Sequence, residues 1–78
     1  MQCFFVHFTC ELGRTYDVAA TLADREIASE IYSVSGEHDL LAKFYLPAGE
    51  DIGRFVAENL HDIPGVARTV TTMTFKAF

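Results

Sequence analysis

The chain has 78 residues, a formal net charge of −5 and a pI of about 4.9. This length suits one domain over residues 1–78, and the six Lys and Arg, scattered from Arg14 to Lys76, form no basic cluster for nucleic acid. No apolar run approaches the roughly 20 residues of a membrane span, and no targeting segment is evident, so we expect a cytoplasmic protein without direct nucleic-acid contacts.

The first predicted element is a strand over Cys3–Cys10, rich in aromatic and β-branched residues. Because Cys3 and Cys10 are seven positions apart in an extended segment, their Cα atoms lie about 23 Å apart, which excludes a disulfide between them. A thin core without disulfides favours a partner subunit as extra stabilisation. Alternation divides the strand between two faces: Phe4, Val6 and Phe8 on one, and Cys3, Phe5, His7 and Thr9 on the other.

The segment after Gly13 has helical periodicity, and a pair of strands follows it. The second strand is predicted over Ala28–Val34 and the third over Asp39–Leu46, joined by a tight reversal at Gly36, where a glycine can take φ > 0. The third strand directs Leu40, Ala42, Phe44 and Leu46 to one side. The apolar positions predicted to face the core from the helix are Tyr16, Ala19, Ala20, Ala23 and Ile27.

A second helix follows the break at Pro47–Gly49, and Glu50 and Asp51 suit the positive end of its dipole. Pro64–Gly65 predicts its end, and Val66–Phe78 predicts a long closing strand that is rich in threonine. The apolar stripe of the helix is the clearest in the chain and consists of Ile52, Phe55, Val56, Leu60 and Ile63.

The element order βαββαβ predicts an α+β, ferredoxin-like plait, in which two helices cover one face of a four-stranded antiparallel sheet. The other face is predicted to be apolar as well. Exposing such side chains costs about 1.5–3 kcal/mol each, so we expect two copies to pair their sheets into a dimeric α/β barrel. The alternative is a monomer with scattered exposed apolar residues. The predicted members of this open face include Phe5, Leu41, Tyr45, Met73 and Phe75.

The turn over Val34–Leu40 gathers carboxylates, an imidazole and free backbone N–H groups at the tip of a hairpin. This chemistry suits an α-amino acid, because its ammonium group needs acceptors such as Asp39 and Glu37, and its carboxylate needs N–H and hydroxyl donors. Threonines two positions apart in a strand point to the same side, as a convergent site requires. The predicted ligand-binding residues are Gly36, Glu37, His38, Asp39, Arg68, Thr69 and Thr71.

Structural alternatives exist for each of these residues. Gly36 can serve the turn alone, Asp39 can cap the hairpin, and threonines are ordinary strand formers. Arg68 is equally suited to an ion pair at the rim of the site. No His or Cys spacing is typical of a metal site, and we expect neither a metal nor a cofactor.

Val34–Leu41 has the sequence VSGEHDLL, and Ile63–Thr72 has the sequence IPGVARTVTT. These segments resemble the V-[ST]-G-x-[YH]-D-L-L and [LI]-P-G-V-x-[RK]-T-x-T motifs of the Lrp/AsnC effector domain, also called the RAM domain. Both occur in the right order with the second helix between them, so the similarity extends over nearly the whole chain. His38 stands where many members have tyrosine, which leaves the identity of the effector open.

The resemblance implies an amino-acid-responsive domain of transcription regulators. Its dimers pair sheets face to face and assemble into rings, often octamers, with effector clefts between dimers near the Gly36–Asp39 turn and the last-strand threonines. Full-length members carry a helix-turn-helix ahead of this domain. Because the first strand begins at Cys3, we expect a stand-alone effector domain, and a full-length regulator of the same family is a plausible partner.

The leading hypothesis is therefore a non-catalytic sensing and oligomerisation module for an amino acid or a related metabolite. One alternative is a small dimeric α/β-barrel enzyme, such as a monooxygenase or isomerase, with His7 in its cleft. No nucleophile–base pair or paired carboxylates stand out, so no catalytic residue is predicted. The other alternative is a purely structural assembly domain with an empty cleft.

Overall fold

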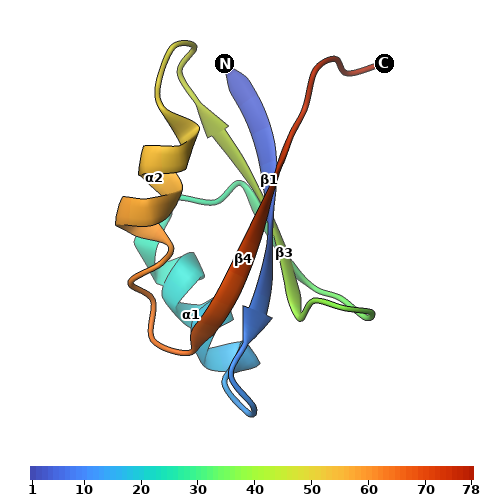
Figure 1. Ribbon diagram of the computed structural model, residues 1–78, viewed down its shortest axis with the longest axis vertical. Coiled ribbons are helices and arrows are strands. Elements are labelled where there is room, and N and C mark those ends of the chain that lie inside the picture. The colour runs from blue at the N-terminus through green and yellow to red at the C-terminus, as the bar shows by residue number, and fades with distance from the viewer.

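The computed structural model describes all residues, 1–78, and confirms the predicted order βαββαβ. Neighbouring strands are antiparallel, and the sheet order is β2-β3-β1-β4, as in a ferredoxin-like plait. Both helices lie on the same side of the sheet (Figure 1). The elements are β1 (Gln2–Cys10), α1 (Thr15–Arg25), β2 (Glu30–Ser33), β3 (Leu40–Leu46), α2 (Ile52–Asn59) and β4 (Val66–Met73).

One hydrophobic core lies between the sheet and the helices. The rings of Phe4 and Phe44, from adjacent strands, stack with their centroids 5.3 Å apart, and Phe55 of α2 meets both rings edge-on. The even-numbered residues of β1 and β3 supply much of this core, as their alternation predicts. Its buried members are Phe4, Val6, Phe8, Val18, Leu22, Leu40, Ala42, Phe44, Ile52, Val56, Leu60 and Ile63.

The predicted core stripe of the first helix is only partly confirmed, because Ala19 and Ile27 pack against the core whereas Ala20 and Ala23 are exposed. Helix α1 buries Val18 and Leu22, whereas Tyr16 is 79% exposed and Ile27 lies beyond the helix end. The large apolar pair at positions i and i+4 sets the buried face, because alanines contribute little burial energy. The helix ends at Glu26, which takes the left-handed conformation with φ of 55°.

Helix α2 confirms its predicted stripe but ends earlier than predicted. Its start is capped by the Asp51 carboxylate, which accepts a hydrogen bond from the Arg54 N–H. The helix ends at Asn59, so Leu60 and Ile63 enter the core from the following turn. Neither helix has the length and apolar composition needed to cross a bilayer.

Three strands are shorter than predicted. β2 covers Glu30–Ser33 and β3 starts at Leu40, although the N–H of Val34 still bonds to the Asp39 carbonyl across the hairpin. β4 ends at Met73 instead of continuing to Phe78. The start of β1 sets an upper limit: Met73 pairs with Phe4 and β1 begins at Gln2, so the residues after Phe75 have no strand to pair with.

The sheet register also corrects the predicted open face. Met73 is the cross-strand partner of Phe4, so it lies on the helix-covered face, and Phe75 lies beyond the strand. Phe5, Leu41 and Tyr45 do lie on the open face, as predicted. The open-face positions given by the register are Cys3, Phe5, His7 and Thr9 of β1, Glu30 and Tyr32 of β2, Leu41, Lys43 and Tyr45 of β3, and Arg68, Val70 and Thr72 of β4.

Candidate functional site

The β2–β3 turn has the tight geometry that its glycine predicts. Gly36 takes φ of +100°, which side chains disfavour, and the turn closes through a 3.0 Å hydrogen bond from the Val34 N–H to the Asp39 carbonyl. Gly36 and Glu37 are exposed at the tip. Figure 1 shows the turn projecting beyond the sheet on the side away from the helices. The carboxylate of Glu37 is therefore accessible to a partner or a ligand.

Asp39 ties this turn to the end of β1. Its carboxylate accepts a 2.8 Å hydrogen bond from the Cys10 N–H, and its own N–H donates to the Phe8 carbonyl at 2.8 Å. Burial, followed by this nearby carboxylate, raises the pKa of the Cys10 thiol. The side chain of Asp39 thus anchors the hairpin to a neighbouring strand, and one of its oxygens carries that bond.

Two imidazoles meet beside the turn. The rings of His38 and His7 lie 4.9 Å apart, and His38 Nδ1 is 3.2 Å from the Thr9 hydroxyl. Both β1 residues belong to the open face, so His38 folds from the turn onto that face. The predicted turn residues Gly36, Glu37, His38 and Asp39 therefore form one group at the tip of the β2–β3 hairpin, next to the end of β1.

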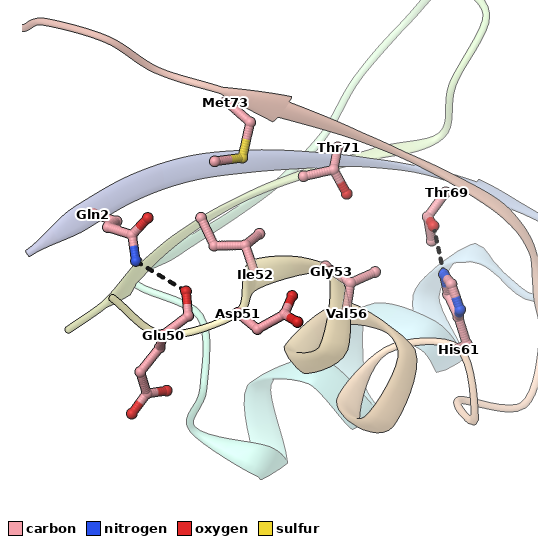
Figure 2. Close-up of a pocket in the computed structure, with 10 residues that line it drawn as sticks. All are labelled: Gln2, Glu50, Asp51, Ile52, Gly53, Val56, His61, Thr69, Thr71 and Met73. Carbon is pink, nitrogen blue, oxygen red and sulfur yellow. Dashed lines mark hydrogen bonds between the residues drawn. The ribbon is translucent and has the colours of Figure 1, made fainter. Parts of the chain in front are cut away.

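A groove of about 660 Å³ runs on the other side of the sheet, between α2 and the edge strand β4 (Figure 2). Ile52 and Val56 of α2 form its apolar floor, and Met73 of β4 faces them. Its two ends are held by side-chain hydrogen bonds. Gln2 donates to the Pro47 and Glu50 carbonyls at one end, and His61 bonds to Thr69 at the other.

Thr69 and Thr71 both line this groove, so the predicted common direction of their side chains is confirmed. His61 Nε2 lies 2.9 Å from the Thr69 hydroxyl, and Thr71 is exposed. Arg68 lines a smaller hollow of about 330 Å³ at the free edge of β4, together with His61 and Thr69. Thr69 and Thr71 thus form a second group in the groove, whereas Arg68 is an open-face residue, opposite Thr9, that lies at the free edge of β4.

The two groups of predicted site residues do not meet within one chain. The turn group contacts β1 on the open-face side, whereas Thr69 and Thr71 lie in the groove on the helix side. Sequence reasoning also missed part of the groove, namely Gln2, His61 and Met73. Met73 could have been found, because it lies two positions after Thr71 and shares its face. Gln2 and His61 carry no sequence signal, since their approach to the groove only becomes apparent in three dimensions.

Comparison with known proteins assigns the fold and these motifs to a family. The model of the Lrp/AsnC ligand-binding domain matches residues 3–78. The chain belongs to the Lrp/AsnC ligand-binding domain family. This membership confirms the resemblance carried by the VSGEHDLL and IPGVARTVTT segments, and the curated relatives that share this domain are transcription regulators.

Relatives of this Lrp/AsnC domain include an uncharacterised helix-turn-helix-type transcriptional regulator of Pyrococcus horikoshii, which is 39% identical over 69 residues. That match covers 77% of this chain and 46% of the relative, so the chain spans about half the length of the curated relatives it matches. Among solved structures, TTHA0845 of Thermus thermophilus superposes with a TM-score of 0.89 at 29% identity, covering 100% of this chain and 98% of that one.

The same fold occurs in the transcriptional regulator NMB0573 of Neisseria meningitidis, solved as a complex with L-methionine. Its TM-score is 0.82 at 17% identity, covering 96% of this chain and 50% of that chain. At this identity the likeness concerns the fold alone. The family and its curated relatives are transcription regulators, which favours a regulatory role over an enzymatic one.

Proposed function

We propose that this domain is a non-catalytic cytoplasmic sensor of an amino acid or a related metabolite, in which two subunits together form each effector site. The observation that supports it is the separation of donors from acceptors. Glu37 and Asp39 offer carboxylates at the hairpin turn, whereas Thr69 and Thr71 offer hydroxyls in the groove. A zwitterion needs both kinds of group, and one chain presents them on different sides of its sheet.

The turn is suited to the ammonium group of the effector. The Asp39 oxygen that does not bond to Cys10 can accept from it, and Glu37 is exposed beside it. The groove is suited to the carboxylate through the hydroxyls of Thr69 and Thr71, and Arg68, which lines the separate hollow at the edge of β4, would add a positive charge. Gly36 would contribute its backbone N–H, and His38 would close the site from the turn. The Neisseria regulator supports this choice of ligand class, because its domain of the same fold was solved with L-methionine.

Assembly would follow from the same surfaces. Pairing of two open sheet faces would give a dimer, and contact between the turn of one dimer and the groove of another would give a ring, such as an octamer. Effector binding in this contact would shift the equilibrium between dimer and ring. A full-length Lrp/AsnC regulator presents the same domain and is the proposed macromolecular partner, reached through like-with-like sheet pairing.

Isothermal titration with the twenty amino acids tests the sensor directly, with sedimentation equilibrium run with and without the ligand that binds. Thr71→Val should weaken binding about tenfold, because it removes one hydrogen bond to a charged group. Thr21→Val, on helix α1 and outside the groove, the turn and the open face, is the matched control and should leave affinity unchanged. Silence across the whole panel would leave the structural assembly domain as the better interpretation.

A mixing experiment tests whether two subunits share the site. Asp39→Asn keeps the acceptor for Cys10 but removes the charge that would hold the ammonium group. Each variant alone, Asp39→Asn or Thr71→Val, should bind weakly. Subunits of the two variants, mixed and reassembled, should recover about a quarter of the wild-type sites, because random assortment pairs some intact turns with intact grooves. No recovery would place both residues in the site of one chain.

A further inference from the structure

The last five residues, Thr74–Phe78, form a short segment that we call the C-terminal arm. Phe75 and Phe78 are fully exposed, at 102% and 110% of the reference value, although large aromatic side chains usually find cover. The base of the arm is fixed, because the Thr74 hydroxyl donates a 2.6 Å hydrogen bond to the Cys3 carbonyl. Figure 1 shows the arm leaving the sheet on the side away from the helices.

The arm therefore overhangs the open face of the sheet. Together they line a hollow of about 700 Å³, whose wall on the sheet side includes Phe5 and Tyr45. The Lys43 ammonium lies 5.9 Å and 5.3 Å from the centroids of these two rings. At the opposite end of the face, the β2–β3 turn projects on the same side (Figure 1). A partner packed on the open face would thus lie between the C-terminal arm and the β2–β3 turn.

The area of the open face indicates how much contact surface a partner could bury there. The Cα atoms extend 35 Å along the longest axis and 18 Å along the shortest, and Figure 1 views the sheet edge-on down the shortest axis. The flat outline of the molecule on this side is then at most about 600 Å², the same order as the roughly 800 Å² of accessible surface that each partner of a standard interface buries. Two exposed phenylalanines bury about 150–250 Å² each and can add to this area.

We propose that the C-terminal arm docks on a second copy of this chain and holds the two paired sheets together, with Phe75 and Phe78 packed against the partner's open face. The inference rests on the sheet pairing of the proposed function and adds the segment that stabilises it. The arm has the chemistry of an anchor, two aromatic rings separated by Lys76 and Ala77, with its base tied to β1. A second copy would thus both cover the open face and bury the two exposed rings.

Sedimentation velocity over a dilution series measures the dimer dissociation constant of wild type and variants. The double variant Phe75→Ser with Phe78→Ser should raise this constant at least tenfold, because both anchors are lost. The matched control Ala77→Ser changes the arm without removing a ring and should stay within about twofold of wild type. Deletion of residues 74–78 should reproduce the double variant. None of these residues belongs to the core, so the variant subunits should fold.

The possible outcomes distinguish a failure of the arm proposal from a failure of the sheet pairing. A wild-type chain that sediments as a single subunit at micromolar concentration would overturn both the sheet pairing and the arm. A wild-type dimer with an unchanged dissociation constant in the double variant would overturn the arm alone. Filtered NOE spectra of dimers assembled from labelled and unlabelled chains give the position: contacts from the Phe75 and Phe78 rings to Phe5 or Tyr45 should be intermolecular. Purely intramolecular contacts would show that the arm folds onto its own sheet, against the proposal.

Discussion

The two faces of the sheet differ in burial and in charge. On the covered face, Phe4, Phe8 and Phe44 are completely buried, and Phe4 and Phe44 stack on each other and meet α2. On the open face, Tyr45 and Val70 remain 43% and 41% exposed. Polar groups stand among the open-face residues, including a Lys43–Glu30 ion pair of 3.5 Å at one edge. The strands place no charged residue on the covered face, so composition as well as burial distinguishes the two faces.

The difference shows where a single subunit obtains its stability and which surface the proposed sheet pairing would use. The packing contacts of the covered face are all made within one chain. The open face has apolar side chains, a histidine pair and two projecting ends, all of which suit a second body of similar shape. Substitutions on the covered face should change unfolding, whereas those on the open face should change association.

The largest effect is expected from Phe44→Ala. It removes a fully buried ring that stacks on Phe4 and meets Phe55, and such truncations cost about 3–5 kcal/mol. Urea unfolding monitored by circular dichroism gives the free energy. Tyr45→Ala, the next residue on the opposite face, should cost a single subunit less than about 1 kcal/mol. Equal losses for the two variants would contradict the distinction between the faces.

The next largest loss of stability is expected from Gly65→Ala, which tests the contact between α1 and the start of β4. Gly65 has φ of +97°, and a Cβ there would lie 2.9 Å from Arg14 Cβ and 3.0 Å from Val18 Cγ2. Gly49→Ala is the matched control, with φ of +91° and open space around it. Backbone strain of about 1–3 kcal/mol is common to both variants. Thermal melts should therefore show the larger loss for Gly65→Ala, and similar losses would mean that Arg14 moves aside freely.

Asp51→Ala should have a smaller effect, on the helix that covers the sheet. The Asp51 carboxylate caps α2 by accepting from the Arg54 N–H at 3.0 Å, and loss of such a cap costs about 1 kcal/mol. Glu50→Ala removes a carboxylate from the same turn without removing a cap, and it is the control for charge. Urea midpoints of the two variants give the difference, and a loss as large for Glu50→Ala would assign the effect to charge alone.

The smallest effect concerns the Arg25–Asp62 ion pair, whose closest N–O distance is 2.8 Å and which links α1 to the turn after α2. The hydrogen bond from Arg25 lowers the pKa of Asp62. Because the folded pKa is the lower one, the stabilisation is present above the ordinary aspartate pKa of about 3.9 and is lost as pH falls through the folded value.

Asp62→Asn should therefore melt below wild type at about pH 6, and the gap should close towards about pH 2. Salt should narrow the gap at neutral pH, because the pair is largely exposed. Asp24→Asn, on the exposed surface of α1, is the control and should show no such pH-dependent gap. A gap that persists unchanged in acid would mean that the carboxylate charge does not stabilise the fold.

Much of the candidate site could be predicted from the sequence, and its division into two groups could not. Gly36 and Asp39 predict the hairpin turn, and the spacing of Thr69 and Thr71 predicts a common side-chain direction. Both predictions depend on local sequence only. The partners of Asp39 and Thr69 are remote in sequence or lie outside any pattern. Cys10 is 29 positions from Asp39, and His61 reaches Thr69 from an irregular turn.

By itself, the sequence determined the element order, the α2 stripe and the alternation of β1 and β3, since each depends on periodicity over a few residues. Tertiary packing was needed to establish which face of α1 is buried, where β4 ends and which face of the sheet Thr71 and Met73 share. Those features depend on what packs opposite: the sheet selects Val18 and Leu22, and the start of β1 limits the length of β4. Local patterns offer a helix several possible faces and a strand several possible ends, and long-range contacts select among them.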